Sequence, residues 1–511
     1  MRALISVYDK TELSPFARGL TELGFELVAS GGTAEYLQAE GLSVTLVESV
    51  TSFPEVLGGR VKTLHPRIHA GILARQGFEQ DTDELEREGI EPFELVCVNL
   101  YPFERAAARR GATEEEVVEL IDVGGPSLLR AAAKNHSWVT AVCRPEDYGD
   151  VLRDLHAGGG VSSPDLRRRL AGIAFVTTAA YEAAIARWFG ENEQFPQTLI
   201  PVFEKVRDLS YGENPHQAAA LYAERGVRTH LLSMVEQLHG RELSFNNLND
   251  LNAARLLVRE FALPTAVIVK HANPCGVAVG GTIEEAYERA LASDPVSAYG
   301  GVVVLNRAVT PVLGELLAEQ FVEVLLARGF DPAALEALAR KPDTRILNDM
   351  ERRNTEPAER DYKRVLGGLL VQERDWDVDD REGMRAVAGT PSEAQWGDLL
   401  FAWRVCKHVG SNAVVIARDL RTIGVGAGQM SRVDAVRIAV EKAREHGHAL
   451  EGAALASDAF FPFPDGPRLA LDAGVTALIQ PGGSKRDADV IDAVESAGAT
   501  MIFTGRRHFR H

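Results

Sequence analysis

The strongest candidate for chemistry in this sequence is a Lys-His pair that follows an apolar run. Ala266 to Val269 has the composition of a buried strand, and Lys270-His271 come directly after it. Asn273-Pro274 and Gly276 then predict a turn. A histidine titrates near neutral pH and suits a general base, while an adjacent ammonium stabilises developing negative charge. We therefore predict proton transfer by this pair, the alternative being an ordinary surface dipeptide.

Polar, glycine-rich segments recur through the second half of the chain, at predicted strand ends or turns. They are Tyr211 to Gln217, Asn246 to Asp250, Ser293 to Gly301, Gly424 to Arg432, Ser457 to Phe463 and Gln480 to Lys485. None of them is a GxGxxG motif or a P-loop, and HExxH is absent from the sequence. A simple turn explains any one segment, but so many in one half-chain favour a binding site.

In the first half, Ser30-Gly31-Gly32-Thr33 joins a predicted strand to a predicted helix. Free backbone N–H groups at the start of a helix, together with the helix dipole, attract a phosphate. A plain tight turn is the alternative for a glycine motif of this length. The cations Lys10, Arg60 and Lys62 favour the phosphate site, although a solvated basic loop also explains the last two.

Three further residues in this half have the side chains that proton transfer requires. Tyr101 follows the predicted strand Leu95 to Val98, at the carboxyl end where open α/β sheets bind ligands. Asp122 precedes Gly124-Gly125, and Lys134 comes a few helical turns later. A tyrosine, an aspartate and a lysine near one sheet edge suit acid–base chemistry. Each by itself is better explained as an ordinary surface or packing residue.

The elements that position these residues alternate between strand and helix, so we expect an α/β protein whose first sheet is parallel. Predicted strands are Ala3 to Val7, Phe25 to Ala29, Leu42 to Val47, Leu95 to Val98, Ala266 to Val269, Gly301 to Leu305, Ala413 to Ala417 and Thr422 to Gly426. Asp349 to Lys363 is crowded with charge and predicts a solvated connection. Thr390 to Glu393 predicts a capping box with Pro391 at the first helical position. The helix should run to about Lys407 and deliver His408 and Asn412 to the following loop.

Length and composition bound the class of protein. A chain of 511 residues exceeds one hydrophobic core, and the polar segment from Gly190 to Pro201 predicts the boundary between domains 1–195 and 200–511. The four scattered cysteines exclude the usual zinc frameworks and indicate reduced thiols, so we expect a cytoplasmic protein. The net charge of −18 argues against nucleic acid. The sequence shows no signal peptide and no membrane-spanning apolar run.

Together, and in this order, the motifs resemble the bifunctional purine-synthesis family that joins aminoimidazole carboxamide ribonucleotide (AICAR) formyltransferase to inosine monophosphate (IMP) cyclohydrolase. The resemblance runs from Leu4 almost to His511. It implies a methylglyoxal-synthase-like cyclohydrolase domain, followed by a larger transformylase domain of two similar α/β lobes. It implies formyl transfer from 10-formyltetrahydrofolate to the 5-amine of AICAR and then ring closure with loss of water. It also implies a homodimer with transformylase sites at the subunit interface and no metal or redox cofactor.

The resemblance assigns roles to individual residues. In the cyclohydrolase domain, the residues implied to hold the nucleotide are Ser6, Lys10, Ser30, Gly31, Gly32, Thr33, Arg60, Lys62 and Thr63. Lys62 is also grouped with Tyr101, Asp122 and Lys134 around the closing ring. In the transformylase domain, Lys270, His271 and Asn412 are implied to be catalytic. The implied nucleotide contacts there are Tyr211, Asn247, Gly300, Gly301, Arg507 and Phe509, and the implied folate contacts are Arg432, Pro462, Phe463, Asp465 and Ser484.

One position departs from the family pattern. Ser210 stands before Tyr211-Gly212, where the family carries an arginine that grips the substrate phosphate. We expect Arg207 or Arg507 to supply the missing cation. Two rival functions remain on the sequence alone: a nucleotide-sensing module, against which Lys270-His271 argue, and a monofunctional transformylase with an N-terminal phosphate-sensing domain.

Overall fold

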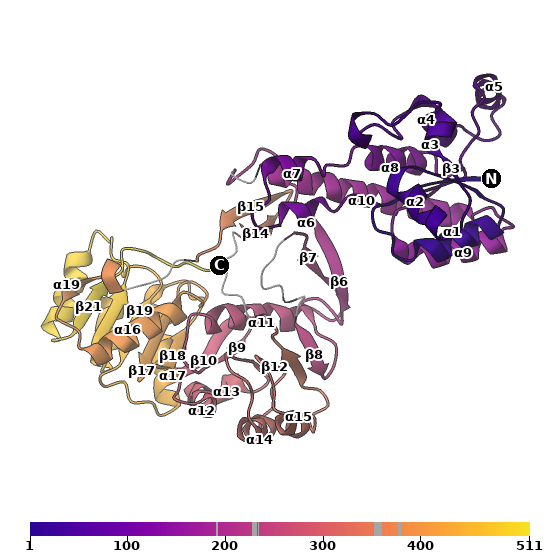
Figure 1. Ribbon diagram of the computed structural model, residues 1–511. Helices are drawn as coiled ribbons and strands as arrows, with labels where there is room; N and C mark the ends of the chain where they lie inside the picture. The colour runs from indigo at the N-terminus through magenta and orange to yellow at the C-terminus, as the bar shows by residue number, and fades with distance from the viewer. Residues whose placement is uncertain (191–192, 227–231, 233–234, 352–359, 377–380) are drawn as a thin grey trace. The chain divides into compact units, whose positions relative to one another are not determined.

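The computed structural model describes residues 1–190, 193–226, 232, 235–351, 360–376 and 381–511. These residues form two compact units (Figure 1). The first comprises residues 1–202 with 224–226, and the second comprises residues 203–223 with 227–511. In the described part of the chain, no helix is both long enough and apolar enough to cross a membrane.

The first unit is built on a five-stranded sheet of order β3-β2-β1-β4-β5 in which every pair is parallel. Its strands are β1 (Arg2–Ser6), β2 (Glu26–Ala29), β3 (Val44–Leu46), β4 (Leu95–Val98) and β5 (Thr140–Val142). The predicted alternation of strand and helix is confirmed here. Because the sheet is parallel, its connections are helices that bury both of its faces.

Helices cover both faces of this sheet. Alternate strand residues, such as Ile5 and Leu4, face opposite cores. The helices and 3-10 turns are α1 (Leu13–Glu22), α2 (Gly31–Ala39), α3 (Val47–Thr51), η1 (Leu57–Gly59), α4 (Pro66–Leu73), α5 (Glu79–Glu88), α6 (Phe103–Ala107), α7 (Glu114–Val118), α8 (Gly124–Lys134), η2 (Pro145–Asp147), α9 (Tyr148–Ala157) and α10 (Pro164–Phe189). Helices α1 and α9 contribute to one core, while α4 and α8 contribute to the other.

The second unit contains a twelve-stranded mixed sheet with the order β16-β21-β20-β19-β17-β18-β10-β9-β11-β12-β13-β8. Its strands are β8 (Glu236–His239), β9 (Thr265–Lys270), β10 (Asn273–Val279), β11 (Val302–Leu305), β12 (Val324–Ala327), β13 (Arg345–Asn348), β16 (Arg385–Ala388), β17 (Val414–Arg418), β18 (Arg421–Gly426), β19 (Ala454–Ser457), β20 (Ala477–Gln480) and β21 (Thr500–Phe503). Outward from the central β18–β10 pair, the strands follow one another in the same chain order on both sides, β10-β9-β11-β12-β13-β8 and β18-β17-β19-β20-β21-β16. Two lobes of the same topology therefore share one sheet.

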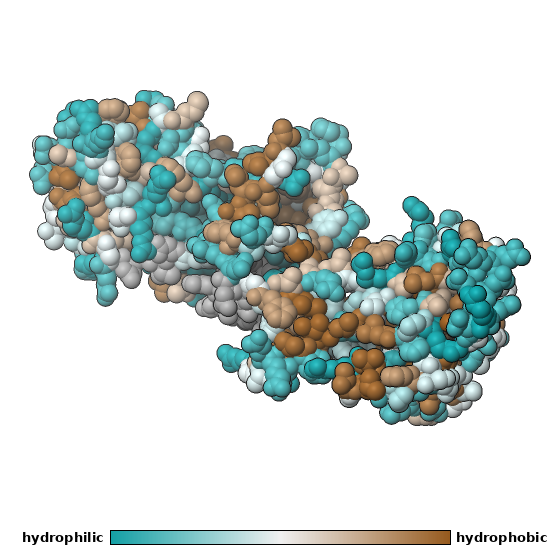
Figure 2. Space-filling view, turned by 90° about the horizontal axis from the view of Figure 1, so that it is seen from above, coloured by the Kyte–Doolittle hydropathy of each residue, from teal (hydrophilic) through white to brown (hydrophobic). Residues whose placement is uncertain are grey.

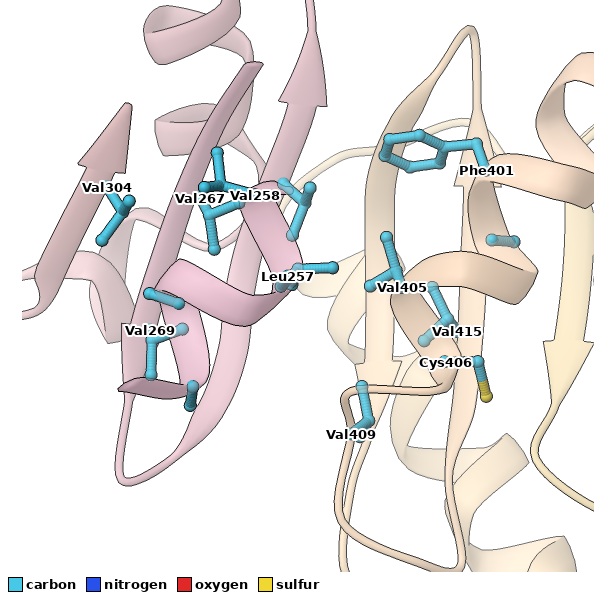
Figure 3. Packing of buried hydrophobic residues seen from close by; sticks show 14 of the residues in the cluster. Leu257, Val258, Val267, Val269, Val304, Phe401, Val405, Cys406, Val409 and Val415 are labelled. Carbon is cyan, nitrogen blue, oxygen red and sulfur yellow. The ribbon is translucent and has the colours of Figure 1, made fainter. Parts of the chain in front are cut away.

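The helices repeat in the same way. The first lobe carries α11 (Phe245–Val258), α12 (Ile283–Ser293), α13 (Pro295–Ala298), α14 (Pro311–Glu319) and α15 (Pro332–Leu338). The second carries η4 (Arg381–Gly383), α16 (Glu393–Cys406), α17 (Arg432–Glu445), α18 (Asp465–Asp472) and α19 (Asp487–Ser496). Helices α11 and α16 lie on the same face of the sheet and share its largest core, where Leu257 and Val405 point toward each other (Figure 3).

Two hairpins of the second unit stand outside the large sheet. They are β6 (Phe203–Leu209) with β7 (Ala219–Glu224), and β14 (Arg360–Val365) with β15 (Gly368–Glu373). The second hairpin exposes apolar side chains, among them Leu366 and Leu370. An isolated two-stranded sheet is only marginally stable in water, so these hairpins require support from other surfaces.

Two local predictions are wrong. The capping box of α16 uses Ser392 and Gln395, not Thr390 and Glu393, because the Ser392 hydroxyl accepts from the Gln395 N–H and the Gln395 side chain accepts from the Ser392 N–H. The turn after Lys270 consists of His271 and Ala272, both with positive φ, while Asn273-Pro274 already belong to β10.

The charged segment from Asp349 to Lys363 also differs from its prediction as a solvated connection. Residues 352–359 of it lie outside the described residues. At one end Asp349 is buried in a bidentate ion pair with Arg255, with both N–O distances at 2.9 Å. At the other end Arg360 begins strand β14. Burial of Asp349 depends on a partner 94 residues away, which local charge density does not indicate.

Candidate active sites

A cavity of about 770 Å³ opens in the first unit at the carboxyl ends of its strands. The cavity is lined by every residue predicted for the site of the first domain except Gly31 and Lys134. The lining residues among them are Ser6, Lys10, Ser30, Gly32, Thr33, Arg60, Lys62, Thr63, Tyr101 and Asp122. Ser6 ends β1, Ser30 follows β2, and Tyr101 follows β4. Since these are neighbouring parallel strands, their ends meet at one sheet edge, which is where open α/β sheets bind ligands.

One end of the cavity has the donors that a phosphate requires. Ser30 is the N-cap of α2, and its hydroxyl makes no capping hydrogen bond, so the first N–H groups of the helix are available. Gly31 has a φ of +47°, and a Cβ there would lie 2.8 Å from the Lys62 Nζ. The Lys10 ammonium donates to the Thr33 hydroxyl at 3.2 Å. Burial lowers the pKa of Lys10, so that its charge is more costly without an anionic ligand.

Asp122 is the carboxyl group of the cavity best suited to proton transfer. Burial raises the pKa of Asp122, against hydrogen bonds from nearby backbone groups that lower it. One of these comes from the Gly125 N–H to Oδ1 at 2.8 Å, while the Asp122 N–H donates to the Tyr181 hydroxyl at 2.8 Å. A carboxyl held in place with a raised pKa suits general acid–base catalysis.

The structure does not bring Lys134 to the cavity. Lys134 is exposed at the last residue of α8, whose first residues, Gly124 and Gly125, line the cavity. The 11 residues of this helix separate its two ends by about 16 Å. A catalytic role for Lys134 therefore stays a prediction without a contact to support it.

Asn99 lines the cavity, and the sequence reading did not single it out. Its side-chain oxygen accepts from the N–H groups of Tyr8 at 2.6 Å and Asp9 at 3.0 Å, and its amide donates to the Asp9 carbonyl at 2.9 Å. Asn99 thus fixes the loop that carries Lys10. Its position directly after strand β4 was the available signal.

In the second unit, the predicted residues gather along one edge of the large sheet. The end of β9 lies beside the starts of β10 and β11, and the start of β17 lies beside the ends of β18 and β19. Strands β20 and β21 run parallel to β19, so they end at the same edge. This edge therefore carries Lys270, His271, Gly300, Gly301, Asn412, Arg432, Pro462, Phe463, Ser484 and Arg507.

His271 occupies a left-handed backbone conformation. His271 and Ala272 form the two-residue turn between β9 and β10, with φ of +53° and +59°. Positive φ at both positions matches a type I′ turn, which usually contains asparagine and glycine. The left-handed conformation costs roughly 1–2 kcal/mol for each non-glycine residue. The Asp250 carboxylate compensates, because it accepts both turn N–H groups, from His271 at 3.0 Å and Ala272 at 2.7 Å.

The two members of the Lys-His pair have different surroundings. The His271 side chain is exposed, and within the described residues no hydrogen bond to its imidazole is found. The Lys270 ammonium donates to the Tyr299 carbonyl at 2.6 Å. Tyr299 directly precedes the predicted substrate contacts Gly300 and Gly301, so Lys270 reaches the segment that carries them. Here Gly300 has a φ of +69°, which favours glycine.

Asn412 is held by a buried network. The Asn412 side-chain oxygen accepts from Arg432 at 2.7 Å, and its amide donates to the Gln429 carbonyl at 2.8 Å. Arg432 is itself buried, and its guanidinium also contacts the fully buried Asp458. The Asp458 carboxylate in turn accepts from the Ser411 hydroxyl. The Arg432 guanidinium is therefore committed to orienting Asn412.

Asn273 connects the turn that carries His271 to the loop that carries Asn412. Its side-chain oxygen accepts from the Gly410 N–H at 2.9 Å, and its amide donates to the His271 carbonyl at 3.1 Å. Gly410 lies two residues before Asn412. The turn that carries His271 and the loop that carries Asn412 are thus joined through one side chain, although about 140 residues separate them in the chain.

The remaining predicted contacts of this unit differ in availability. Asn247 is buried, and its side chain is engaged within the protein. It takes part in the capping box of α11 and donates to Glu323 at 2.8 Å. The Tyr211 carbonyl accepts from the Phe245 N–H at 3.0 Å, which brings Tyr211 to the start of α11. The exposed residues are Pro462, Phe463, Asp465, Arg507 and Phe509, and Ser484 is half-buried. The Arg507 guanidinium lies over the Phe509 ring at 4.5 Å.

The fold and these two sites define an α/β enzyme with a polar cavity at the strand ends of one unit and a Lys-His-Asn constellation in the other. The chain belongs to the AICARFT/IMPCHase bienzyme family, whose model matches residues 132–442, and residues 12–127 match the MGS-like domain. A protein of Magnetococcus marinus named "Bifunctional purine biosynthesis protein PurH" is 50% identical over 527 residues, covering 100% of this chain and 99% of that protein.

A Bacillus cereus protein with the same name is 47% identical over 513 residues, covering 100% of this chain and 99% of its own length. A solved structure described as "Crystal structure of ForH" is 39% identical, covers 37% of this chain and 99% of that chain, and superposes with a TM-score of 0.33. The full-length relatives and the family model support a bifunctional enzyme of purine biosynthesis rather than the monofunctional alternative.

Proposed function

We propose that the second unit transfers a formyl group from 10-formyltetrahydrofolate to the 5-amine of AICAR and that the first unit closes the product to IMP. The chain is a bifunctional formyltransferase and cyclohydrolase by its family. The assignment of ring closure to the first unit rests on its cavity, which is lined by nearly all residues predicted for that reaction.

Formyl transfer requires a base and a group that accommodates developing negative charge. The 5-amine is a weak nucleophile because its lone pair is conjugated with the ring and the carboxamide, so its proton must leave as it attacks the formyl carbon. The exposed His271 imidazole suits this role. Lys270 suits stabilisation of the oxyanion or protonation of the departing folate nitrogen, and Asn412 suits orientation of the formyl oxygen.

Ring closure joins the carboxamide nitrogen to the new formyl carbon and expels water. Orientation supplies much of the rate in such an intramolecular step. We assign the phosphate to the Ser30–Thr33 turn with Lys10, and the acid–base work to Asp122 with Tyr101 and Lys62. Of these residues, all but Gly31 line the cavity. Thr63 and Arg60 line it as well, and Arg60 is paired with Glu119 through its Nε at 3.0 Å.

The folate is assigned to the ends of β19 and β20. Phe463 is half-exposed there with the Arg486 guanidinium 5.2 Å from its ring centroid, and Asp465 begins α18 nearby. An exposed aromatic ring and a carboxylate are suited to a flat, hydrogen-bonding pterin. Arg432 acts on this side through Asn412. Among the described residues, no cluster of three or more His, Cys, Asp or Glu is arranged to hold a metal ion.

The homodimer is part of the same proposal. The β14–β15 hairpin stands apart from the large sheet and exposes Leu366, Leu369 and Leu370, and apolar patches reach the visible surface (Figure 2). Exposed apolar patches of this kind mark interaction surfaces. Equilibrium sedimentation is expected to give twice the monomer mass.

One assay tests the function directly. Purified protein is mixed with AICAR and 10-formyltetrahydrofolate, and IMP is followed by its absorbance and by chromatography. Formation of IMP supports both activities. Accumulation of the formylated nucleotide without IMP would contradict the role of the first unit, and absence of both products would contradict the whole proposal.

A further inference from the structure

The His271 turn has an internal counterpart in the second lobe. Asp419 and Leu420 form the turn between β17 and β18, with φ of +55° and +56°. The Asp398 carboxylate accepts both N–H groups, at 3.0 and 2.7 Å, which are the same distances that Asp250 makes to the His271 turn. We call each aspartate carboxylate, together with the turn that it holds, a clamp. The two clamps are 148 residues apart in the chain. The same spacing separates Glu260 from its hydrogen-bond partner His408.

The helices that carry the two aspartates begin in the same way. Ser244 caps α11 in a capping box with Asn247, and Ser392 caps α16 in a capping box with Gln395. Asp250 and Asp398 lie at corresponding positions, each half-buried. The two clamps therefore share geometry, burial and support, and they differ in what their turns carry.

We propose that Asp250 is a positioning residue for formyl transfer, which holds the turn of His271 and Ala272 in the conformation that aims the His271 imidazole. The proposal rests on the proposed role of His271 as the base. Neither His271 nor Ala272 favours positive φ by itself, so the turn depends on a partner that accepts both of its N–H groups.

The second clamp shows what this arrangement does without catalysis. The turn of Asp419 and Leu420 lies at the opposite edge of the sheet, because β18 begins beside the end of β10. There the Leu420 carbonyl accepts from the Val279 N–H at 3.0 Å, and the Asp419 carbonyl accepts from Arg289. No predicted site residue lies in this turn. Asp398 thus serves as a matched structural control for Asp250.

The test compares Asp250→Asn with Asp398→Asn in the full chain. Asparagine keeps the size of the side chain but presents an amide donor to one of the two turn N–H groups, so one hydrogen bond is lost. We expect D250N to lower kcat for formyl transfer about 10- to 100-fold, with the KM for AICAR nearly unchanged, because a small misplacement of a catalytic group is costly. We expect D398N to stay within about threefold of the parent.

Ring closure of the pre-formylated nucleotide reports whether each variant is folded. It should match the parent in both. A second substitution then separates positioning from general stability: Ala272→Gly in the D250N background. Glycine adopts positive φ without a steric cost, so A272G should restore at least part of the lost kcat. If D250N and D398N lose formyl transfer equally, or if A272G restores nothing, the positioning role is overturned.

A double variant distinguishes this inference from the proposed function. If Asp250 acts only through His271, D250N/H271A should be no slower than H271A alone. A full further loss in the double variant contradicts the positioning role. If H271A itself retains the parent rate, the assignment of His271 fails, and with it the basis for Asp250. If H271A is inactive while D250N keeps the parent kcat, only the inference about Asp250 fails.

Discussion

At the scale of single residues, the proposed base His271 lies on a strained turn, and the adjacent Lys270 is tied to a neighbouring segment. His271 has an exposed, unbonded imidazole in the described structure, whereas Lys270 is tied to Tyr299. A group that must accept a proton from substrate benefits from a free ring nitrogen, and a group that must hold charge in place benefits from a tether. These surroundings support the proposed division of roles between the two adjacent residues.

The first prediction is that His271→Ala removes most formyl transfer. Loss of a general base should lower kcat about 10²- to 10⁴-fold. Ring closure of the pre-formylated nucleotide should be unaffected, because His271 belongs to the second unit. The two activities are measured separately on one preparation, and equal damage to both would contradict separate sites.

The second prediction concerns the phosphate grip that Ser210 does not provide. The Ser210 hydroxyl donates to the Leu243 carbonyl at 3.3 Å, so it is engaged within the protein. Arg507 is exposed beside Phe509 at the site edge. Arg507→Ala should cost roughly 1.5–3 kcal/mol of nucleotide binding, which raises the KM for AICAR about 10- to 100-fold.

The control for this prediction is Arg207→Ala, since Arg207 is the alternative cation. A rise in KM for R207A and not for R507A would transfer the role to Arg207. The Ser210→Arg variant should be neutral or mildly improve binding. Ring closure should not change in any of the three.

The third prediction follows from Asp122. Burial raises its pKa in the folded state, so the ionised form is penalised by folding. This loss of folding stability is complete at a pH above the pKa of Asp122 in the folded state. It disappears as the pH falls through that pKa towards the pKa of Asp122 in the unfolded chain. Asp122→Asn should therefore raise the melting temperature of the first unit at pH 7, with the gain shrinking at acid pH.

The same substitution should abolish most ring closure, by about 10²- to 10⁴-fold. The asparagine oxygen still accepts from the Gly125 N–H, so the loop keeps its hydrogen bond. Melting curves at pH 7 and at acid pH, together with the ring-closure rate, check both effects. An unchanged or lower melting temperature at pH 7 would contradict the burial penalty.

At the scale of elements, strand ends position nearly every residue of both sites. In the first unit, parallel strands β1, β2 and β4 bring Ser6, Ser30 and Tyr101 to one edge. In the second unit, antiparallel pairs at the centre of the sheet bring the end of β9 and the start of β17 to one edge. Lys270, His271 and Asn412 therefore lie at the same edge of the sheet, although they are far apart in the chain.

The fourth prediction is that residues 1–195 fold alone and close the ring. Strands β1 to β5 and helix α10, which ends at Phe189, all lie within this fragment. Its cavity is lined by residues from Ser6 to Gly125. Circular dichroism reports folding, and conversion of the formylated nucleotide reports activity. A folded but inert fragment would contradict the assignment of ring closure to this domain.

At the scale of the whole molecule, the duplicated second unit uses its repeat unequally. Both lobes carry the same hairpin and aspartate clamp, but one turn bears Lys270-His271 and the other bears Arg418-Asp419. The shared core between α11 and α16 joins the lobes into one body (Figure 3). The repeated scaffold thus holds the same strained turn in both lobes, and we propose that formyl transfer uses only the turn that contains His271.

The sequence by itself determined the class of fold, the family and most of the cavity in the first unit. These depend on local signals: apolar strands such as Leu95–Val98, a glycine turn at a helix start, and motifs kept in order along the chain. The MGS-like and AICARFT/IMPCHase matches confirm that class. Strand ends were predictable because hydrophobic runs stop where polar, glycine-rich residues begin.

Only the tertiary structure decided how the transformylase residues are held. The turn of His271 and Ala272 contains no typical turn-forming residue. It is held instead by Asp250, about 20 residues earlier in the chain, which accepts the hydrogen bonds of both turn N–H groups. Asp349 is buried by Arg255, which lies 94 residues away in the chain, and Asn412 is oriented by Arg432, which lies 20 residues away. Lys134 was predicted beside the closing ring, but the length of α8 places it away from the cavity. Such contacts arise from packing between elements, and a local pattern of residue types does not contain them.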